Sequence, residues 1–231
     1  MLFLYGKNLH AQLRYNFTGY SIGAGAGLSR AFADVAKEIN KTACFVNFNY
    51  NYSPFTTFTA ELQAGNLAGG DRVTDQHTRA FDNSFKAVVF YADLQAGEYI
   101  DYGYSKILNV IKNIYVGTGV GVIHNKMTFV QRESLNNSGY IFPGQDASTE
   151  LMVPVRFGYE FKFYNFYQEP YIRLNVGYQM NWVYGEGLDG YNDPPTIFHN
   201  HHVDRYAIFG AGIKYSFGTP VSYKKPIRMF Y

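Results

Sequence analysis

The stretch Leu151-Met-Val-Pro-Val-Arg-Phe-Gly-Tyr-Glu-Phe-Lys-Phe163 decides the fold, because every odd position in it is apolar. A second stretch, from Ile172 to Tyr184, repeats the pattern with apolar residues at the even positions. Apolar residues at every second position indicate β-strands that have one apolar and one polar face. Only the segment from Asn165 to Pro170 separates the two stretches, so together they predict a β-hairpin.

The length of these two strands indicates where the hairpin lies. An ordinary globular strand has roughly five to six residues, and both stretches are longer than that. A tilted strand of about 9 to 11 residues is long enough to cross the hydrocarbon core of a bilayer. The hairpin is therefore predicted to be part of a transmembrane β-barrel.

Further alternating stretches extend the prediction to the rest of the chain. They are Tyr15 to Arg30, Cys44 to Tyr52, Thr57 to Ala64, Val88 to Gln95, Ile114 to Val122 and Ala207 to Phe217. With the hairpin they give eight strands, the even number that closes an antiparallel barrel. The predicted fold class is all-β, an eight-stranded antiparallel up-and-down transmembrane β-barrel.

The lengths of the predicted connections alternate along the chain. The connections after the first, third, fifth and seventh strands are long, as extracellular loops are, and those after the second and sixth are short, as periplasmic turns are. The connection from Glu98 to Asn113 departs from this rule. Its residues Ile107, Val110 and Ile111 have helical spacing, so we expect one or two helical turns there, at the membrane edge.

Composition supports one domain and excludes several classes of protein. The chain has 231 residues, of which 19% are aromatic and only 16% are charged, and it contains 23 glycines. A net charge of +2 is too small to indicate a nucleic-acid partner. Cys44 is the single cysteine, so it has no intramolecular disulfide partner.

The chain is divided into three parts. Residues 1–12 resemble the end of a secretory signal peptide, with cleavage near Ala11. Residues 13–217 form the predicted transmembrane β-barrel. Residues 218–231 are a basic tail, containing Lys224, Lys225 and Arg228, that we expect in the periplasm.

Alternation alone does not distinguish a membrane barrel from a soluble lipocalin-like barrel, because the two differ only in which face is inside. Aromatic residues at both ends of the apolar face indicate two membrane interfaces. The predicted aromatic girdle consists of Tyr52, Phe163, Trp182, Tyr184, Tyr206, Tyr215 and Phe217. The polar face carries glycine and seven charged residues, which we expect to form a lumen ion-pair network: Glu61, Asp93, Arg156, Glu160, Lys162, Arg173 and Lys214.

The chain from about Gln12 to Phe217 resembles the bacterial outer-membrane β-barrel family, in particular the OmpA-like eight-stranded transmembrane barrel. The resemblance is carried by Ile114-Tyr-Val-Gly-Thr-Gly-Val-Gly-Val122, by the polar loop Gly185 to Asp193, and by the aromatic-ended strand Gly212-Ile-Lys-Tyr-Ser-Phe217. It implies a location in the bacterial outer membrane. Members of the family commonly end at the aromatic residue of the last strand, whereas this chain continues to Tyr231.

The predicted function is that of a non-enzymatic outer-membrane β-barrel with a closed, ion-paired lumen. It would act as a structural or binding protein through its extracellular loops, alone or as a subunit of a larger outer-membrane assembly. A small porin or channel is one alternative. A lipid-modifying outer-membrane enzyme is another, for which His124 with Ser148 or Ser134 is the candidate pair of base and nucleophile.

The remaining polar clusters do not predict a cofactor or a metal. His199, His201 and His202 with Asp204 are the one zinc-like group, but adjacent histidines on an extended chain point in opposite directions. Acidic and amide side chains in the polar loop could supply oxygens for calcium, but their spacing matches no EF-hand. These are Glu186, Asp189, Asn192 and Asp193. The expected partners are outer-membrane lipids and other outer-membrane proteins, with no nucleic acid.

Overall fold

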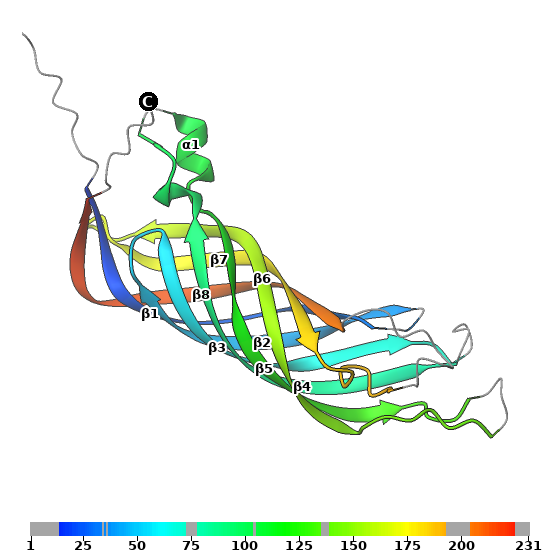
Figure 1. The fold of residues 1–231 in the computed structure, drawn as a ribbon. Helices are drawn as coiled ribbons and strands as arrows, with labels where there is room; N and C mark the ends of the chain where they lie inside the picture. The colour runs from blue at the N-terminus through cyan, green and yellow to red at the C-terminus, as the bar shows by residue number, and fades with distance from the viewer. Residues whose placement is uncertain are drawn as a thin grey trace, which may run out of the picture.

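The computed structural model describes residues 14–33, 35, 37–72, 78–103, 105–134, 139–192 and 204–224. These residues form eight long strands with one short helical connection (Figure 1). The strands are β1 (Arg14–Phe32), β2 (Glu38–Asn51), β3 (Thr56–Gly70), β4 (Ala80–Gln95), β5 (Ile114–Val130), β6 (Ala147–Tyr164), β7 (Pro170–Tyr184) and β8 (Arg205–Lys224). Between β4 and β5 lie the 3-10 turn η1 (Ala96–Glu98) and the helix α1 (Lys106–Ile111). No helix among the described residues has the length and apolar character needed to cross a membrane.

The strands close into a barrel in which each strand pairs antiparallel with its neighbours in the chain, and β8 pairs with β1. The predicted fold class is therefore confirmed. From Ile114 the pairs can be followed through all eight strands, and they return to β5 at His124, ten residues further along. This stagger tilts the strands, and a barrel of eight tilted strands has an interior that side chains fill.

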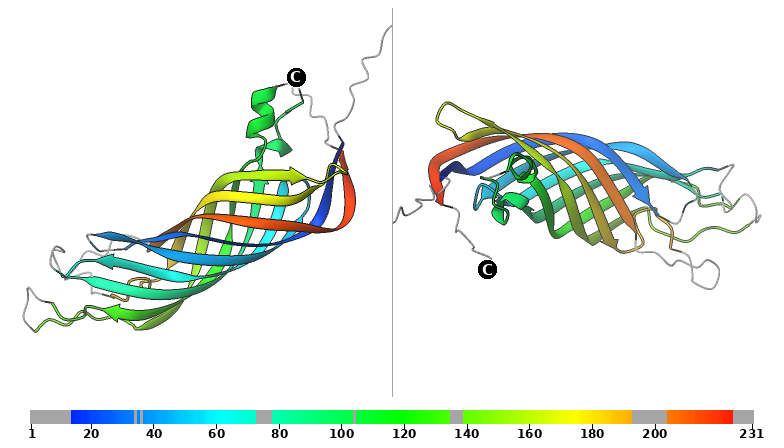
Figure 2. Two further views of the ribbon diagram at one scale, coloured as in Figure 1. Left: turned by 180° about the vertical axis from the view of Figure 1, so that it is seen from behind. Right: turned by 90° about the horizontal axis from the view of Figure 1, so that it is seen from above.

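The two ends of the barrel differ, as Figure 2 shows. The turn end has the connections 52–55, 96–113 and 165–169, the start of β1 and the end of β8. The loop end has the connections 33–37, 71–79, 131–146 and 185–204. The four connections that the sequence predicts to be loops thus lie together at one end.

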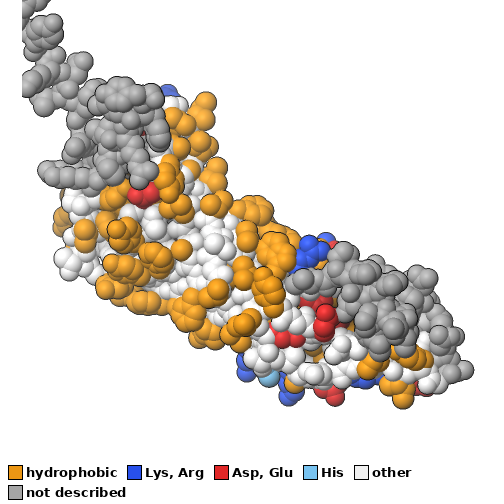
Figure 3. Space-filling model, in the orientation of Figure 1, with side chains coloured by type: hydrophobic (Ala, Val, Ile, Leu, Met, Phe, Trp, Pro, Cys, Tyr) orange, Lys and Arg blue, Asp and Glu red, His pale blue; other side chains and the backbone are white. Residues whose placement is uncertain are grey.

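The two faces of the wall have the sidedness of a membrane barrel. Large apolar side chains such as Leu62, Phe157 and Ile213 are exposed on the outside, while the polar residues between them point inward and are buried. Figure 3 shows hydrophobic side chains over the barrel wall and charged side chains gathered toward the loop end. A soluble barrel would bury its apolar face, so the lipocalin-like alternative is wrong.

Glycine is common on the lumen face because large lumen side chains lie directly against neighbouring strands. A Cβ at Gly25 would overlap the ring of Phe45, which points inward from β2. A Cβ at Gly177 would overlap the hydroxyl of Tyr115, which points inward from β5. Glycine on one strand therefore makes room for an aromatic ring from another.

Several predicted boundaries change in the structure. The sequence predicts strands that end at Ala64 and begin again at Val88, but β3 continues to Gly70 and β4 begins at Ala80. The alternation is lost in that region because outward positions such as Asn66 are polar, although the strands continue. At the other end of the barrel, β8 passes Phe217 and pairs with β1 as far as Lys224. Residues 218–224 of the predicted tail are therefore part of the barrel, and residues 225–231 and the predicted signal segment 1–12 lie outside the described residues.

The lipid-facing assignment predicts that charge on the outer wall destabilises the barrel. Ile213 lies near the middle of the apolar part of β8 and is 55% exposed. We expect Ile213→Arg to lower the free energy of unfolding in phospholipid vesicles by about 2 to 4 kcal/mol, because the guanidinium would lie in hydrocarbon. The measurement is a denaturant titration of the folded protein in vesicles. The matched control is Ile213→Ala, and an equal effect of the two variants would contradict the assignment.

Candidate functional site: the filled lumen

Four charged residues form a basic cluster in the part of the lumen near the turn end. Glu160 on β6 is its one carboxylate, and three cations from β6, β7 and β8 surround it. The Glu160 carboxylate oxygens lie 3.9 Å from Lys162 Nζ, 3.9 Å from Arg173 Nη1 and 3.4 Å from Lys214 Nζ. Gln95 Nε2 also donates a 3.0 Å hydrogen bond to this carboxylate. One acid thus holds three buried bases together, and the cluster has a formal charge of +2.

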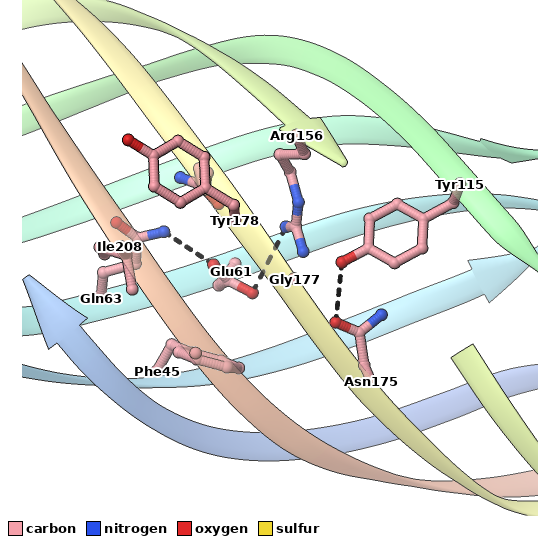
Figure 4. Close-up of a pocket in the computed structure, with 11 residues that line it drawn as sticks. Phe45, Glu61, Gln63, Tyr115, Arg156, Asn175, Gly177, Tyr178 and Ile208 are labelled. Carbon is pink, nitrogen blue, oxygen red and sulfur yellow. Dashed lines mark hydrogen bonds and ion pairs between the residues drawn. The ribbon is translucent and has the colours of Figure 1, made fainter. Parts of the chain in front are cut away.

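The other three charged lumen residues form an acidic cluster further along the lumen. Arg156 on β6 lies between two carboxylates, with Nη1 3.8 Å from Glu61 Oε2 and Nε 3.6 Å from Asp93 Oδ1 (Figure 4 shows Arg156 facing Glu61). The guanidinium also lies 3.7 Å from the ring centroid of Tyr91, whose hydroxyl donates to Glu61. Two acids share one base, so the formal charge of this cluster is −1.

All seven charged residues that the sequence places in the lumen are buried there by the fold. Neither carboxylate oxygen of Asp93 accepts a hydrogen bond from a described residue. The Arg156 guanidinium is therefore the group that compensates the negative charge of this carboxylate. A cavity of about 20 Å3 lies beside Arg156, Glu61 and Asn175, which is room for about one water molecule. The lumen at this level is therefore packed with side chains.

An apolar layer lies in the lumen next to these clusters, toward the loop end. It consists of the buried side chains Phe85, Val89, Ile123, Met152, Val183, Tyr206 and Ile208. The predicted place of Tyr206 in the aromatic girdle is wrong. Tyr206 is fully buried, its ring lies 5.2 Å from that of Phe85, and its hydroxyl donates to Gln63. The physical reason is parity, because even positions of β8 point inward.

The other six predicted girdle residues lie outside the lumen. Tyr52, Phe163, Tyr184, Tyr215 and Phe217 are exposed, and Trp182 is partly exposed on the same face of β7 as Tyr184. Their arrangement as a membrane girdle stays a prediction.

The mouth at the loop end is filled by a loop plug, which we define as residues 187–191 together with Phe142. Leu188 is fully buried, and its carbonyl accepts a hydrogen bond from Asn83 on β4. The Tyr191 hydroxyl donates to the carbonyl oxygen of Gln131, and its ring lies 5.6 Å from that of Phe142. The sequence predicts this segment to be a solvated polar loop, and the structure instead folds it into the mouth.

A second seal lies at the turn end. Phe55, in the turn between β2 and β3, is fully buried, with its ring 5.5 Å from that of Tyr102. Lys162 Nζ donates to the Pro54 carbonyl oxygen at 2.6 Å and so ties this turn to the basic cluster. Glu98 in η1 accepts hydrogen bonds from Ser53, at 2.7 Å, and from Tyr223, at 2.8 Å. We call this seal the Phe55 floor. The sequence does not predict it, because Ser53-Pro54-Phe55 has the pattern of an ordinary turn.

The candidate enzyme residues do not come together. His124 points outward from β5, and its Nδ1 lies 2.8 Å from Thr149 Oγ1. Ser148 is the next residue on β6 and so points to the other face, where its hydroxyl donates to Gly187 O. Ser134 lies outside the strands and is buried, with its amide bonded to Tyr140 O. No described serine is thus placed to be activated by His124.

The candidate metal residues fall in two groups. His199, His201, His202 and Asp193 lie outside the described residues. Among the described residues no group of histidine, cysteine and acidic side chains has a geometry that could hold a metal ion. Asp189 is buried and accepts a hydrogen bond from the Tyr191 amide, so its role is inside the loop plug.

Three solved structures are similar to this chain over most of its length. Neisserial surface protein A (NspA) has a TM-score of 0.47 and 14% identity, covering 87% of this chain and 98% of that one. Ail, the attachment invasion locus protein of Yersinia pestis, has a TM-score of 0.45 and 14% identity, covering 86% and 99%. The N-terminal β-barrel domain of Pseudomonas aeruginosa OprF has a TM-score of 0.40 and 12% identity, covering 85% and 97%. No family model and no curated protein matches the chain.

These similarities concern the fold. The closed eight-stranded antiparallel barrel has the architecture that the predicted resemblance to outer-membrane β-barrels implies. The predicted location in the bacterial outer membrane is consistent with the closed barrel and its apolar exterior, because closed barrels are the β-structures that span membranes.

The loop plug predicts a pH dependence at the mouth. Burial, and then the neighbouring carboxylates of Asp189, Glu186 and Glu150, raise the pKa of the Asp204 carboxyl well above its ordinary value. The closed plug therefore favours the neutral carboxyl of Asp204. The closed plug becomes less stable as the pH rises from the ordinary aspartate pKa toward the raised pKa of Asp204. Asp204 Oδ2 accepts a hydrogen bond from the Leu188 amide, which an asparagine oxygen can also accept.

We expect Asp204→Asn to keep the plug closed as the pH rises, because it removes the charge and keeps the acceptor. The measurement is hydrogen exchange of the Leu188 and Tyr191 amides at pH 5 and pH 8, corrected for intrinsic exchange rates. Protection in the parent protein should fall between the two pH values, and protection in the variant should not. The same fall in both proteins would show that Asp204 does not control the plug.

Proposed function

We propose that the protein is a closed β-barrel of the bacterial outer membrane that acts as a structural or binding protein through its loop end, without conducting solutes. The observation that supports this proposal is that buried side chains of the described residues occupy the lumen from the turn end to the loop end. The Phe55 floor, the two charged clusters, the apolar layer and the loop plug follow one another from the turn end to the loop end. A pore would need a continuous hydrated path through all of them.

The loop end is the part of the barrel that we expect to meet other molecules. Long loops face the cell exterior in barrels of this kind, which puts the turn end in the periplasm. The outward residues near the loop end change from apolar to polar or charged, as at Lys86, His124 and Lys126, while the strands continue beyond them. The strands thus carry the loops above the apolar belt on a rigid platform, where binding residues are commonly placed.

Two alternatives have less support. A small porin would require the charged clusters to leave a water-filled path, and the cavity beside Arg156 has room for about one water. An enzyme would require a nucleophile and a base that a third group orients, and among the described residues the His124 imidazole, beside the exposed Thr149 hydroxyl, has no hydrogen bond to a carboxylate. The expected partners are outer-membrane lipids around the belt and outer-membrane proteins at the loop end, and membership of a larger assembly stays a prediction.

The test of the closed lumen is conductance of the purified protein in planar bilayers. We expect the parent protein to show no steady conductance. Arg156→Ala should be less stable and show brief openings, because it leaves the buried carboxylates of Glu61 and Asp93 without their cation, at a cost of about 3 to 5 kcal/mol. Arg30→Ala, which changes an arginine outside the lumen, is the control and should remain silent. Steady, large conductance of the parent protein would overturn the proposal and favour the porin.

A further inference from the structure

The apolar exterior of the barrel differs in height from one side to the other. On β6 the outward apolar residues extend from Leu151 to Phe163, which corresponds to about 30 Å along the membrane normal for a tilted strand. On β4 they extend only from Val88 to Leu94, or about 15 Å, and the exposed Lys86 ends them on the loop side. An outer-membrane barrel presents an apolar band about 25 Å tall. The wall near β4 is therefore short by about 10 Å.

The helix α1 lies next to this short side, between the end of β4 and the start of β5. None of its residues is buried, although four of its six are apolar, and Ile107 and Val110 are 74% and 61% exposed. An isolated helix of this length is not stable in water, because it has too few hydrogen bonds to offset the cost of nucleation. Ser105 caps its first turn, and the other described residues cover Leu108 and Ile111 only in part and leave Ile107 and Val110 exposed. Its stability therefore depends on what lies around it.

A hydrogen bond shows on which side of the wall the helix lies. Tyr159 occupies an odd, outward position of β6, and its hydroxyl donates to the carbonyl oxygen of Val110 at 2.8 Å. Tyr159 is the partner of Ile114, the first residue of β5, which is itself exposed on the apolar exterior. The last turn of α1 is thus attached to the lipid-facing side of the barrel. Figure 1 shows α1 at the turn end, and Figure 3 shows hydrophobic side chains on it.

We propose that α1 is an interfacial helix that inserts Ile107 and Val110 into the membrane leaflet at the turn end. Its exposed apolar side chains extend the apolar exterior beyond Ile114, where β5 begins. The exposed Lys106 at its first position is suited to the lipid phosphates. The occupant of this surface is the bilayer, because the surface continues the lipid-facing wall. The proposal requires only that the barrel span a membrane, and it is independent of whether the lumen is closed.

The test uses tryptophan fluorescence in lipid vesicles. Trp182 is the only tryptophan, so Trp182→Phe provides a silent background into which Ile107→Trp is introduced. Asn109→Trp is the matched control on the same helix, because two residues of helix separate it from Ile107 by about 200°. Phe161→Trp, on the exposed apolar wall of β6, is the reference for a residue in lipid. The vesicles contain phosphatidylcholine and phosphatidylglycerol, with and without bromine on the acyl chains close to the headgroup.

We expect bromolipid to reduce the emission of Ile107→Trp about as strongly as that of Phe161→Trp, and to affect Asn109→Trp less than half as much. Heat-modifiable gel migration identifies the folded fraction of each variant. Emission of Ile107→Trp that bromolipid leaves unchanged and that acrylamide quenches would place the helix in water and overturn the proposal. Blue-shifted emission that neither agent quenches would place it against protein, a second copy or a partner, and would overturn it as well.

Discussion

The narrow lumen is the constraint on which the rest of the structure depends. Eight strands with this stagger enclose a space that only side chains can occupy, so every inward residue must pack against others from across the barrel. Each of the seven buried charges lies 3.9 Å or less from an opposite charge, as where three cations surround Glu160 and Arg156 lies between two carboxylates. Aromatic rings fit because glycine faces them, as Gly177 faces Tyr115.

The same constraint relates the wall to the two ends. The charged clusters occupy the part of the lumen inside the apolar belt. Toward the loop end, the apolar layer and the loop plug close the mouth, and the Leu188 carbonyl and the Tyr191 hydroxyl of the plug are hydrogen-bonded. At the turn end the Phe55 floor is tied to the basic cluster through Lys162. The ends are thus extensions of the lumen packing, and the outer wall is left free to contact lipid.

The period-two pattern predicts the strands, their order and the inward position of the seven charged residues. It does so because one face of a closed sheet always faces the lumen and the other always faces the outside. The stagger of the strands then determines which of these charges meet, as where Arg156 reaches Glu61 across the lumen. Tyr206 is misplaced because it lies one residue before the predicted strand, at an even and therefore inward position of β8. Leu188 and Phe55 lie in glycine- or proline-containing segments that have the pattern of solvated turns, and only the three-dimensional fold shows that both are buried.

The most direct test of the filled lumen is the reactivity of a thiol inside it. Gln179 points inward and lines the small cavity beside Arg156, so Gln179→Cys, made together with Cys44→Ser, places a single thiol at the centre of the lumen. The reagent is a small charged methanethiosulfonate, added to either side of vesicles that contain the folded protein. The packed lumen predicts no modification until the protein is unfolded. Rapid modification of the folded barrel from either side would contradict it.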